Sequence, residues 1–198
     1  MFFDLYYMPI DHFAKQKKDI LSKADFSKKG SIDERLIPII KHINFLDDYY
    51  TTSSCSGRII IMSFSESGKK NQAKWIYVTH DLAKFEDMKL NDLPKDPVYF
   101  RQEVLILHIA CRNLEFADKL LHLVANAGFR RTAIIAMGKD RVIVEVMSSE
   151  QLSVPIALNG KFIVDEEYLC TLVNIANQKM EKNFKLIKKL ESKIKELK

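Results

Sequence analysis

The sequence predicts an α+β fold, in which helices and antiparallel hairpins are mixed rather than strictly alternating. Two pairs of β-prone segments favour this class, because each pair is separated by a short turn-rich stretch: 58–65 with 74–79, and 132–137 with 141–147. Apolar residues at helical spacing surround these pairs, in segments 10–24, 31–46, 113–127 and from residue 165 onward. The chain has 198 residues and is 47% hydrophobic, which is enough for one domain with a real core.

The first half is predicted to begin with two helices, over 10–24 and 31–46. Ser31 and Glu34 make the S-x-x-E capping box that starts the second helix, and Pro38 is expected to kink or interrupt it. Strands are expected over 49–54, 58–65 and 74–79, and a helix over 80–90. Residues 91–97 contain two prolines and read as a linker.

The second half opens with the apolar run 102–111, which is typical of a fully buried strand. The helix over 113–127 is expected to end at Gly128, and Asp165 to begin a long C-terminal helix. The end of that helix carries a narrow seam that would pack back on the domain or pair weakly with another chain: Ile187, Leu190, Ile194 and Leu197. We therefore predict a single domain of two diverged repeats, about 25–93 and 98–177, followed by a basic helical tail, 178–198.

The net charge of +5 is concentrated in that tail. Residues 178–198 contain eight lysines and three glutamates, so the first 177 residues are neutral overall. The body of the protein is therefore not a uniformly basic platform for nucleic acid. The tail is either an extra clamp for phosphates or simply a solvated helix face.

Several protein classes are excluded by what the sequence lacks. No stretch approaches the roughly 20 apolar residues of a membrane span, and the N-terminal segment lacks the features of a signal peptide, so a cytoplasmic protein is expected. The three cysteines are far apart, which argues against a zinc site or disulfide framework, and we expect no metal. The glycine-rich nucleotide signatures and the H-E-x-x-H motif are also missing.

The segment TTSSCSGR, residues 51–58, is the outstanding candidate site. Hydroxyls and main-chain N–H groups next to Arg58 suit a phosphate or carboxylate, and Gly57 allows the backbone to approach a ligand closely. An ordinary turn rich in serine and threonine explains the same residues equally well. Cys55 is not a phosphatase nucleophile, because the position six residues later is Ile61 rather than arginine.

Other candidate side chains each have an ordinary structural explanation. Residues 26–33, FSKKGSID, form an anion-friendly helix start, although Asp33 also suits the helix dipole. Trp75 would stack on a ring or lie in the core, and His80 would act as a general base or sit beside a helix cap. His108 in its apolar strand is most simply a core histidine, and Arg130 binds an anion or is solvated.

Taken in order, several segments resemble the tRNA wybutosine-synthesizing protein 3 family. They are DFSKKGSID, TTSSCSGR, the pair Trp75 and His80, EVLILHIACR and AGFRRTAI, and the resemblance runs from about residue 25 to about residue 183. The sequence departs from the family pattern where Val104 and Leu105 follow Glu103, and where Thr132 and Ala133 follow the second arginine.

The resemblance implies a methyltransferase that uses S-adenosylmethionine. Its substrate would be phenylalanine tRNA, at N-4 of the demethylwyosine base that carries an aminocarboxypropyl chain next to the anticodon. The implied fold is not a Rossmann fold but two β/α repeats around a single barrel-like mixed sheet. A non-catalytic RNA-binding protein and a hydrolase using Cys55 are the alternatives.

Under this resemblance we assign candidate roles to individual residues. His80 or Asp33 would accept the proton that the ring nitrogen releases. The cofactor carboxylate or the aminocarboxypropyl chain would be bound by Ser53, Ser54, Ser56 and Arg58. Substrate contacts would come from Ser27, Lys29, Trp75, Glu103, His108 and Arg130.

Overall fold

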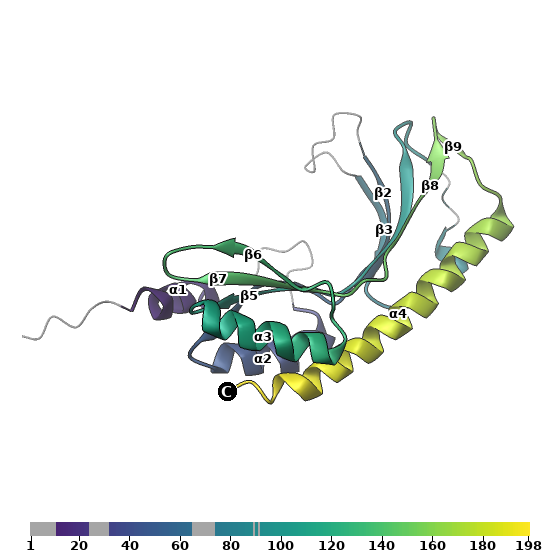
Figure 1. Ribbon diagram of the computed structural model, residues 1–198. Helices are drawn as coiled ribbons and strands as arrows, with labels where there is room; N and C mark the ends of the chain where they lie inside the picture. The colour runs from purple at the N-terminus through teal and green to yellow at the C-terminus, as the bar shows by residue number, and fades with distance from the viewer. Residues whose placement is uncertain (1–10, 24–31, 65–73, 89, 91) are drawn as a thin grey trace, which may run out of the picture.

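The computed structural model describes residues 11–23, 32–64, 74–88, 90 and 92–198. Two antiparallel sheets meet at an elbow, and helices lie along its outer side (Figure 1). The fold is α+β, as the sequence predicts, and the strands form an open, curled half barrel rather than a closed one.

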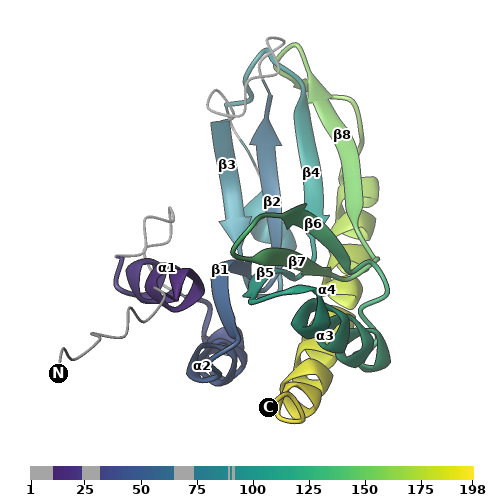
Figure 2. The same cartoon turned by 60° about the vertical axis from the view of Figure 1, so that its left-hand side comes forward.

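The first sheet has four strands in the order β1-β5-β7-β6. They are β1 (Tyr49–Cys55), β5 (Ile106–Cys111), β7 (Val142–Met147) and β6 (Ala133–Met137). The second sheet has the order β3-β2-β4-β8-β9, and its first four strands rise side by side in Figure 2. They are β3 (Lys74–Thr79), β2 (Arg58–Ser63), β4 (Val98–Glu103), β8 (Leu152–Leu158) and the short β9 (Lys161–Phe162).

The elbow is made where the chain passes from one sheet to the other. β1 leads into β2 through Ser56 and Gly57, and β4 leads into β5 through Val104 and Leu105. Because β1 pairs with β5 and β2 pairs with β4, these two short breaks lie next to each other. Two neighbouring strand pairs thus bend at the same level, and this bend makes the inner corner of the elbow.

Helices cover the outer side of both sheets. α2 (Ile37–Phe45) and α3 (Leu114–Ala127) pack on the first sheet, where Leu107, Ile109 and Val144 are fully buried in a shared core. The long α4 (Glu166–Ile194) runs past both sheets, and its first half packs on β2, β4 and β8 in a second core. On the inner side, α1 (His12–Leu21) covers only the far end of the first sheet, through Phe13 against Tyr50.

Most local predictions are confirmed. α3 begins at the cap Asn113 and ends at Gly128 in a left-handed conformation, and Asp165 caps the start of α4. The strand predicted over 74–79 is β3, and the hairpin predicted over 132–147 is β6 and β7. The predicted linker forms no helix or strand at its described positions, 92–97. The division into two repeats stays a prediction.

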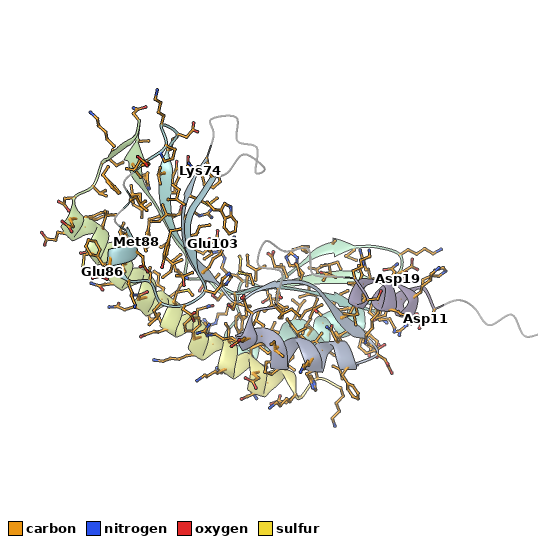
Figure 3. All side chains as sticks on the ribbon, turned by 180° about the vertical axis from the view of Figure 1, so that it is seen from behind. Asp11, Asp19, Lys74, Glu86, Met88 and Glu103 are labelled. Carbon is orange, nitrogen blue, oxygen red and sulfur yellow. The ribbon has the colours of Figure 1, made fainter. Side chains whose placement is uncertain are left out.

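The predicted helix over 80–90 is wrong, because side chains bind the backbone groups that a helix would use. Thr79 Oγ1 accepts the N–H of Asp81, and the side-chain amide of Asn177 binds both the N–H and the carbonyl of Ala83. What remains helical is a single 3-10 turn, η3 (Phe85–Met88), which Figure 3 shows beside α4.

Two further predicted elements are interrupted. The helix expected over 31–46 is a 3-10 turn, η1 (Glu34–Leu36), followed by α2, whose first turn contains Pro38; Ser31 lies outside the described residues. Proline fits there because the first turn of a helix needs no N–H from it. The strand expected over 102–111 is split between β4 and β5 by the bend at Val104 and Leu105.

The seam at the end of α4 packs back on the domain. Ile187, Leu190, Ile194 and Leu197 are buried in the core of the first sheet, beside α2 and α3. The lysines between them, such as Lys188 and Lys189, are exposed. Within the described residues, no helix combines the length and apolarity that crossing a membrane requires.

Candidate active site at the elbow

The backbone of the elbow is held by two buried side chains. Asp33, which precedes η1, accepts the N–H of Ser56 at 2.8 Å through its Oδ2. Asn183 of α4 donates to the carbonyl of Ser56 at 2.6 Å and accepts the N–H of Leu105 at 3.1 Å. One amide therefore joins both breaks, and because it is fully buried these bonds are shielded from water.

Gly57 completes this arrangement through its conformation. Its φ of +96° is in the left-handed region, and an added Cβ would lie 2.8 Å from Asn183 Nδ2 and 2.8 Å from the carbonyl oxygen of Glu103. Any side chain here would push the two breaks and α4 apart. The glycine in TTSSCSGR is thus required by the crossing of the sheets, whether or not a ligand approaches it.

His80 lies against the same turn. Its Nδ1 is 3.1 Å from the carbonyl oxygen of Gly57 and 3.3 Å from Asp33 Oδ2. Because a carbonyl and a carboxylate only accept hydrogen bonds, Nδ1 carries the hydrogen and Nε2 of the neutral ring holds the lone pair. The side chain is partly exposed, so the elbow holds an oriented imidazole with a basic nitrogen.

Arg58 forms the charged part of the corner. Its Nε donates to Glu103 Oε2 at 2.6 Å, and its guanidinium lies 4.5 Å from the centre of the Trp75 ring. Arg101 approaches the other oxygen of Glu103 at 3.5 Å. Two guanidinium groups share one carboxylate, so this cluster keeps an excess positive charge and is partly open to solvent. Figure 3 shows Glu103 close to where the two sheets meet, and Lys74 farther along the second sheet.

Cys55 is near His80 and Asp33 but is not set up as a nucleophile. Burial raises the pKa of the Cys55 thiol above its ordinary value, so the thiolate is disfavoured. One ligand atom from each of Asp33, Cys55 and His80 lies within 4.8 Å of the others, a grouping that can hold a metal ion. However, Asp33 Oδ2 and His80 Nδ1 already serve the hydrogen bonds described above, so a cation bound through these two atoms would have to displace those bonds.

The three serines of the turn have different surroundings. Ser53 lies opposite His108 on the inner face of the first sheet, and its Oγ is 2.9 Å from His108 Nδ1. Ser54 lies opposite Leu107, a core residue, so it points to the other face of the strand. Ser56 is fully buried and acts here through its backbone. Of the three hydroxyls, only that of Ser53 is exposed on the inner face.

The structure thus brings most predicted site residues to the elbow but not all of them. Asp33, His80, Arg58, Trp75 and Glu103 lie around one corner. Ser53 and His108 are on the adjoining inner face. Ser27 and Lys29 lie outside the described residues, and Arg130 is exposed in the loop after α3. Six of the eight tail lysines are on α4, which runs along the outer side.

Sequence reasoning missed three residues at the elbow. Asn183 occupies a buried seam position of α4 among apolar residues, and a polar residue at such a position was the available indication. Arg101 and Glu145 are charged residues that alternate with apolar ones on β4 and β7. That alternation marks them as facing away from the helices, but their partners lie on other strands.

Comparison with known proteins identifies the family. The family model for methyltransferase TYW3 matches residues 15–196, which is most of the chain.

The chain belongs to the methyltransferase TYW3 family.

Relatives of this TYW3 chain are found in animals and archaea. The chain is 42% identical over 185 residues to a tRNA wybutosine-synthesizing protein 3 homolog of Danio rerio, covering 90% of this chain and 73% of that protein. It is 36% identical to the tRNA(Phe) 7-((3-amino-3-carboxypropyl)-4-demethylwyosine(37)-N(4))-methyltransferase 1 of Pyrococcus horikoshii, covering 93% and 95%. The solved structure of the PH1069 protein from the same organism matches with a TM-score of 0.82 at 37% identity, covering 92% of this chain and 95% of that one. These matches confirm the family that the ordered motifs predict.

Proposed function

We propose that this TYW3 protein methylates N-4 of the demethylwyosine base that carries an aminocarboxypropyl chain, in phenylalanine tRNA. The observation that carries the proposal is the match to the archaeal enzyme of that name, over 95% of its length, together with the same fold. The polar elbow supports it, because it gathers an oriented imidazole, paired guanidinium groups and an aromatic ring around one corner.

S-adenosylmethionine is the proposed methyl donor, and when bound it supplies an electrophilic methyl group. The residues of the elbow fit such a molecule. The excess positive charge of Arg58 and Arg101 around Glu103 suits a carboxylate. The indole of Trp75 offers an apolar surface beside them, although the Arg58 guanidinium is stacked near its ring. Since a methyl group moves in one displacement, the main task of these residues is to position the reacting groups.

His80 is the proposed proton acceptor, and Asp33 positions it. The ring nitrogen of the substrate must release its proton as it forms the bond to the methyl carbon. Nε2 of His80 is the free basic nitrogen, because Nδ1 is held by Gly57 and Asp33. Asp33 is itself buried and bonded to the Ser56 N–H, so it is better suited to orient the imidazole than to accept the proton.

Contacts with the tRNA backbone are proposed for Lys29 and Arg130 on the basis of their charge. The lysine-rich tail is on the outer side of the molecule in Figure 1, away from the inner corner. We therefore propose that any phosphate contact it makes is with tRNA that wraps beyond the elbow. A location in the cytoplasm also stays a prediction.

The decisive experiment is methylation of phenylalanine tRNA that carries the demethyl precursor base. Mass spectrometry of the digested nucleosides is expected to find one added methyl group on that base. Calorimetry with S-adenosylmethionine is expected to show saturable binding, which a non-catalytic RNA-binding protein would not give. Arg58→Ala is expected to weaken cofactor binding or turnover. If it changed neither, the proposed role of the 51–58 segment would be wrong.

A further inference from the structure

Three side chains form a hydrogen-bonded line across neighbouring strands of the first sheet. Ser53 of β1 lies opposite His108 of β5, which lies opposite Glu145 of β7. Ser53 Oγ is 2.9 Å from His108 Nδ1, and His108 Nε2 is 2.8 Å from Glu145 Oε2. Residues directly opposite each other on neighbouring strands point to the same face. The line is therefore on the inner face, since Leu107 and Val144, next to it in sequence, are buried against the helices.

The chemistry of the partners determines which atoms of this line carry hydrogen. An ionised carboxylate only accepts, so Nε2 of His108 donates its hydrogen to Glu145. In the neutral imidazole the lone pair is then on Nδ1, which accepts the O–H of Ser53. Ser53 is exposed, and its oxygen presents lone pairs to solvent. The outer end of the line is consequently a hydrogen-bond acceptor, with a negative charge behind it.

A site of this kind binds an N–H group, and it favours a cationic one. The Arg58–Glu103–Arg101 cluster at the corner has the opposite preference, because its excess charge is positive. Ser53 is therefore a poor partner for the cofactor carboxylate, which is one of the two ligands that the sequence analysis assigns to it, the other being the aminocarboxypropyl chain. The inner surface offers a positive region at the corner and a separate acceptor region on the first sheet.

The geometry points to the Ser53–His108–Glu145 line as the binding site for the ammonium group of a 3-amino-3-carboxypropyl chain. This rests on the proposed function, in which two molecules carry that chain: the modified base, and S-adenosylmethionine on its sulfur. Ser53 touches the ammonium group, and His108 and Glu145 are positioning residues that keep its oxygen an acceptor. The line would make the enzyme prefer ligands that carry the amino group.

The test compares ligands with and without the chain in Glu145→Gln, which keeps an acceptor for His108 but removes the charge. For the base, kcat/KM is measured on tRNA with and without the aminocarboxypropyl group on the demethylwyosine. For the cofactor, calorimetry compares S-adenosylmethionine with 5′-methylthioadenosine, which lacks the amino-acid chain. Loss of a charge-assisted hydrogen bond is expected to reduce the preference for the chain-bearing ligand on the order of tenfold or more in one of the two pairs. The affected pair identifies the source of the ammonium group.

Matched variants separate binding from folding. Ser53→Ala is expected to reduce the same preference as Glu145→Gln, and Ser53→Thr to restore it. Ser192→Ala, at an exposed serine of α4, is expected to leave the preference unchanged. If these residues had only a structural role, the substitutions would lower kcat/KM for both tRNAs, or the affinity for both cofactor ligands, by the same factor. The ratio within each pair would then stay unchanged.

An unchanged ratio in both pairs would overturn the inference, and so would labelling of Ser53 by a fluorophosphonate, which would make it a nucleophile. If wild-type protein neither methylated the tRNA nor bound the cofactor, the proposed function would fail first.

Discussion

Asn183→Ala should destabilise the protein strongly, because one buried amide joins the two breaks at the elbow. Asn183 donates to the Ser56 carbonyl and accepts the Leu105 N–H, and it is 1% exposed. Alanine would leave both backbone groups buried without a partner. Each unsatisfied group costs about 1–3 kcal/mol, so the free energy of unfolding is expected to fall by about 2–6 kcal/mol. That is a large part of the ~5–15 kcal/mol stability of a typical domain.

The assay is urea unfolding followed by circular dichroism and by the fluorescence of Trp75, the single tryptophan, which lies at the corner. Asn174→Ala is the matched control, since Asn174 is exposed on the same helix and shares the change in helix propensity. A different result would refute the reasoning from burial: a free energy of unfolding for Asn183→Ala that is less than about 1 kcal/mol below that of this control. The Ser56 carbonyl and the Leu105 N–H would then have found other partners.

A second variant at this position tests the direction of each hydrogen bond. Asn183→Asp can still accept from the Leu105 N–H but, when ionised, cannot donate to the Ser56 carbonyl. Burial disfavours the charged form and raises the pKa of such a carboxyl. Its stability should therefore be lowest at high pH and increase as pH falls through that raised pKa, because the protonated acid regains a donor. An opposite pH trend relative to wild type would contradict the assigned directions.

Three other changes have expected outcomes. Gly57→Ala should lower the free energy of unfolding by at least about 1–2 kcal/mol from its left-handed φ alone, whereas Gly138→Ala, where an added Cβ meets nothing closer than 3.6 Å, should be nearly neutral in urea unfolding. Because burial raises the pKa of the Cys55 thiol, iodoacetamide should label it more slowly at pH 8 in folded than in urea-unfolded protein, as followed by mass spectrometry of the peptides. Arg58→Lys keeps the charge but loses the Nε hydrogen bond to Glu103 and the planar guanidinium beside Trp75. Calorimetry should therefore show weaker binding of S-adenosylmethionine, and the fluorescence of Trp75 should change.

For each of these three expectations, one experimental result would contradict it. Equal stability of the two glycine variants would mean that the elbow tolerates a side chain. Equal labelling rates in folded and unfolded protein would mean that the Cys55 thiolate is not disfavoured. An Arg58→Lys protein with wild-type cofactor affinity would show that the site needs only a positive charge there.

Local chemistry made several elements predictable from the sequence. Asn113 and Asp165 cap helices by binding N–H groups three residues ahead, and Gly128 ends one by adopting a conformation that other residues avoid. β2 and β3 follow from β-prone segments on either side of a turn. The order of the motifs around residues 51–58 also sufficed to predict the family, which the comparisons confirm.

Other features depended on contacts between distant parts of the chain. The segment after Thr79 has a helical pattern, yet Asn177 takes the backbone groups of Ala83 and prevents the helix. The apolar run 102–111 looks continuous, but it bends at Leu105, whose N–H is bound by Asn183. No local pattern reveals such bonds, because the partners are 78 to 94 residues away in sequence.

The candidate site shows the same division. The sequence by itself determined that residues 51–58 are polar, flexible at Gly57 and charged at Arg58, because these properties belong to the residues. Only the tertiary structure decided that this segment crosses between two sheets, so that Gly57 is needed for close packing and Ser53 and Ser54 face opposite ways. Strand pairing brings His108 and Glu145 to Ser53, and a polar side chain has defined chemistry only once its partners are in place.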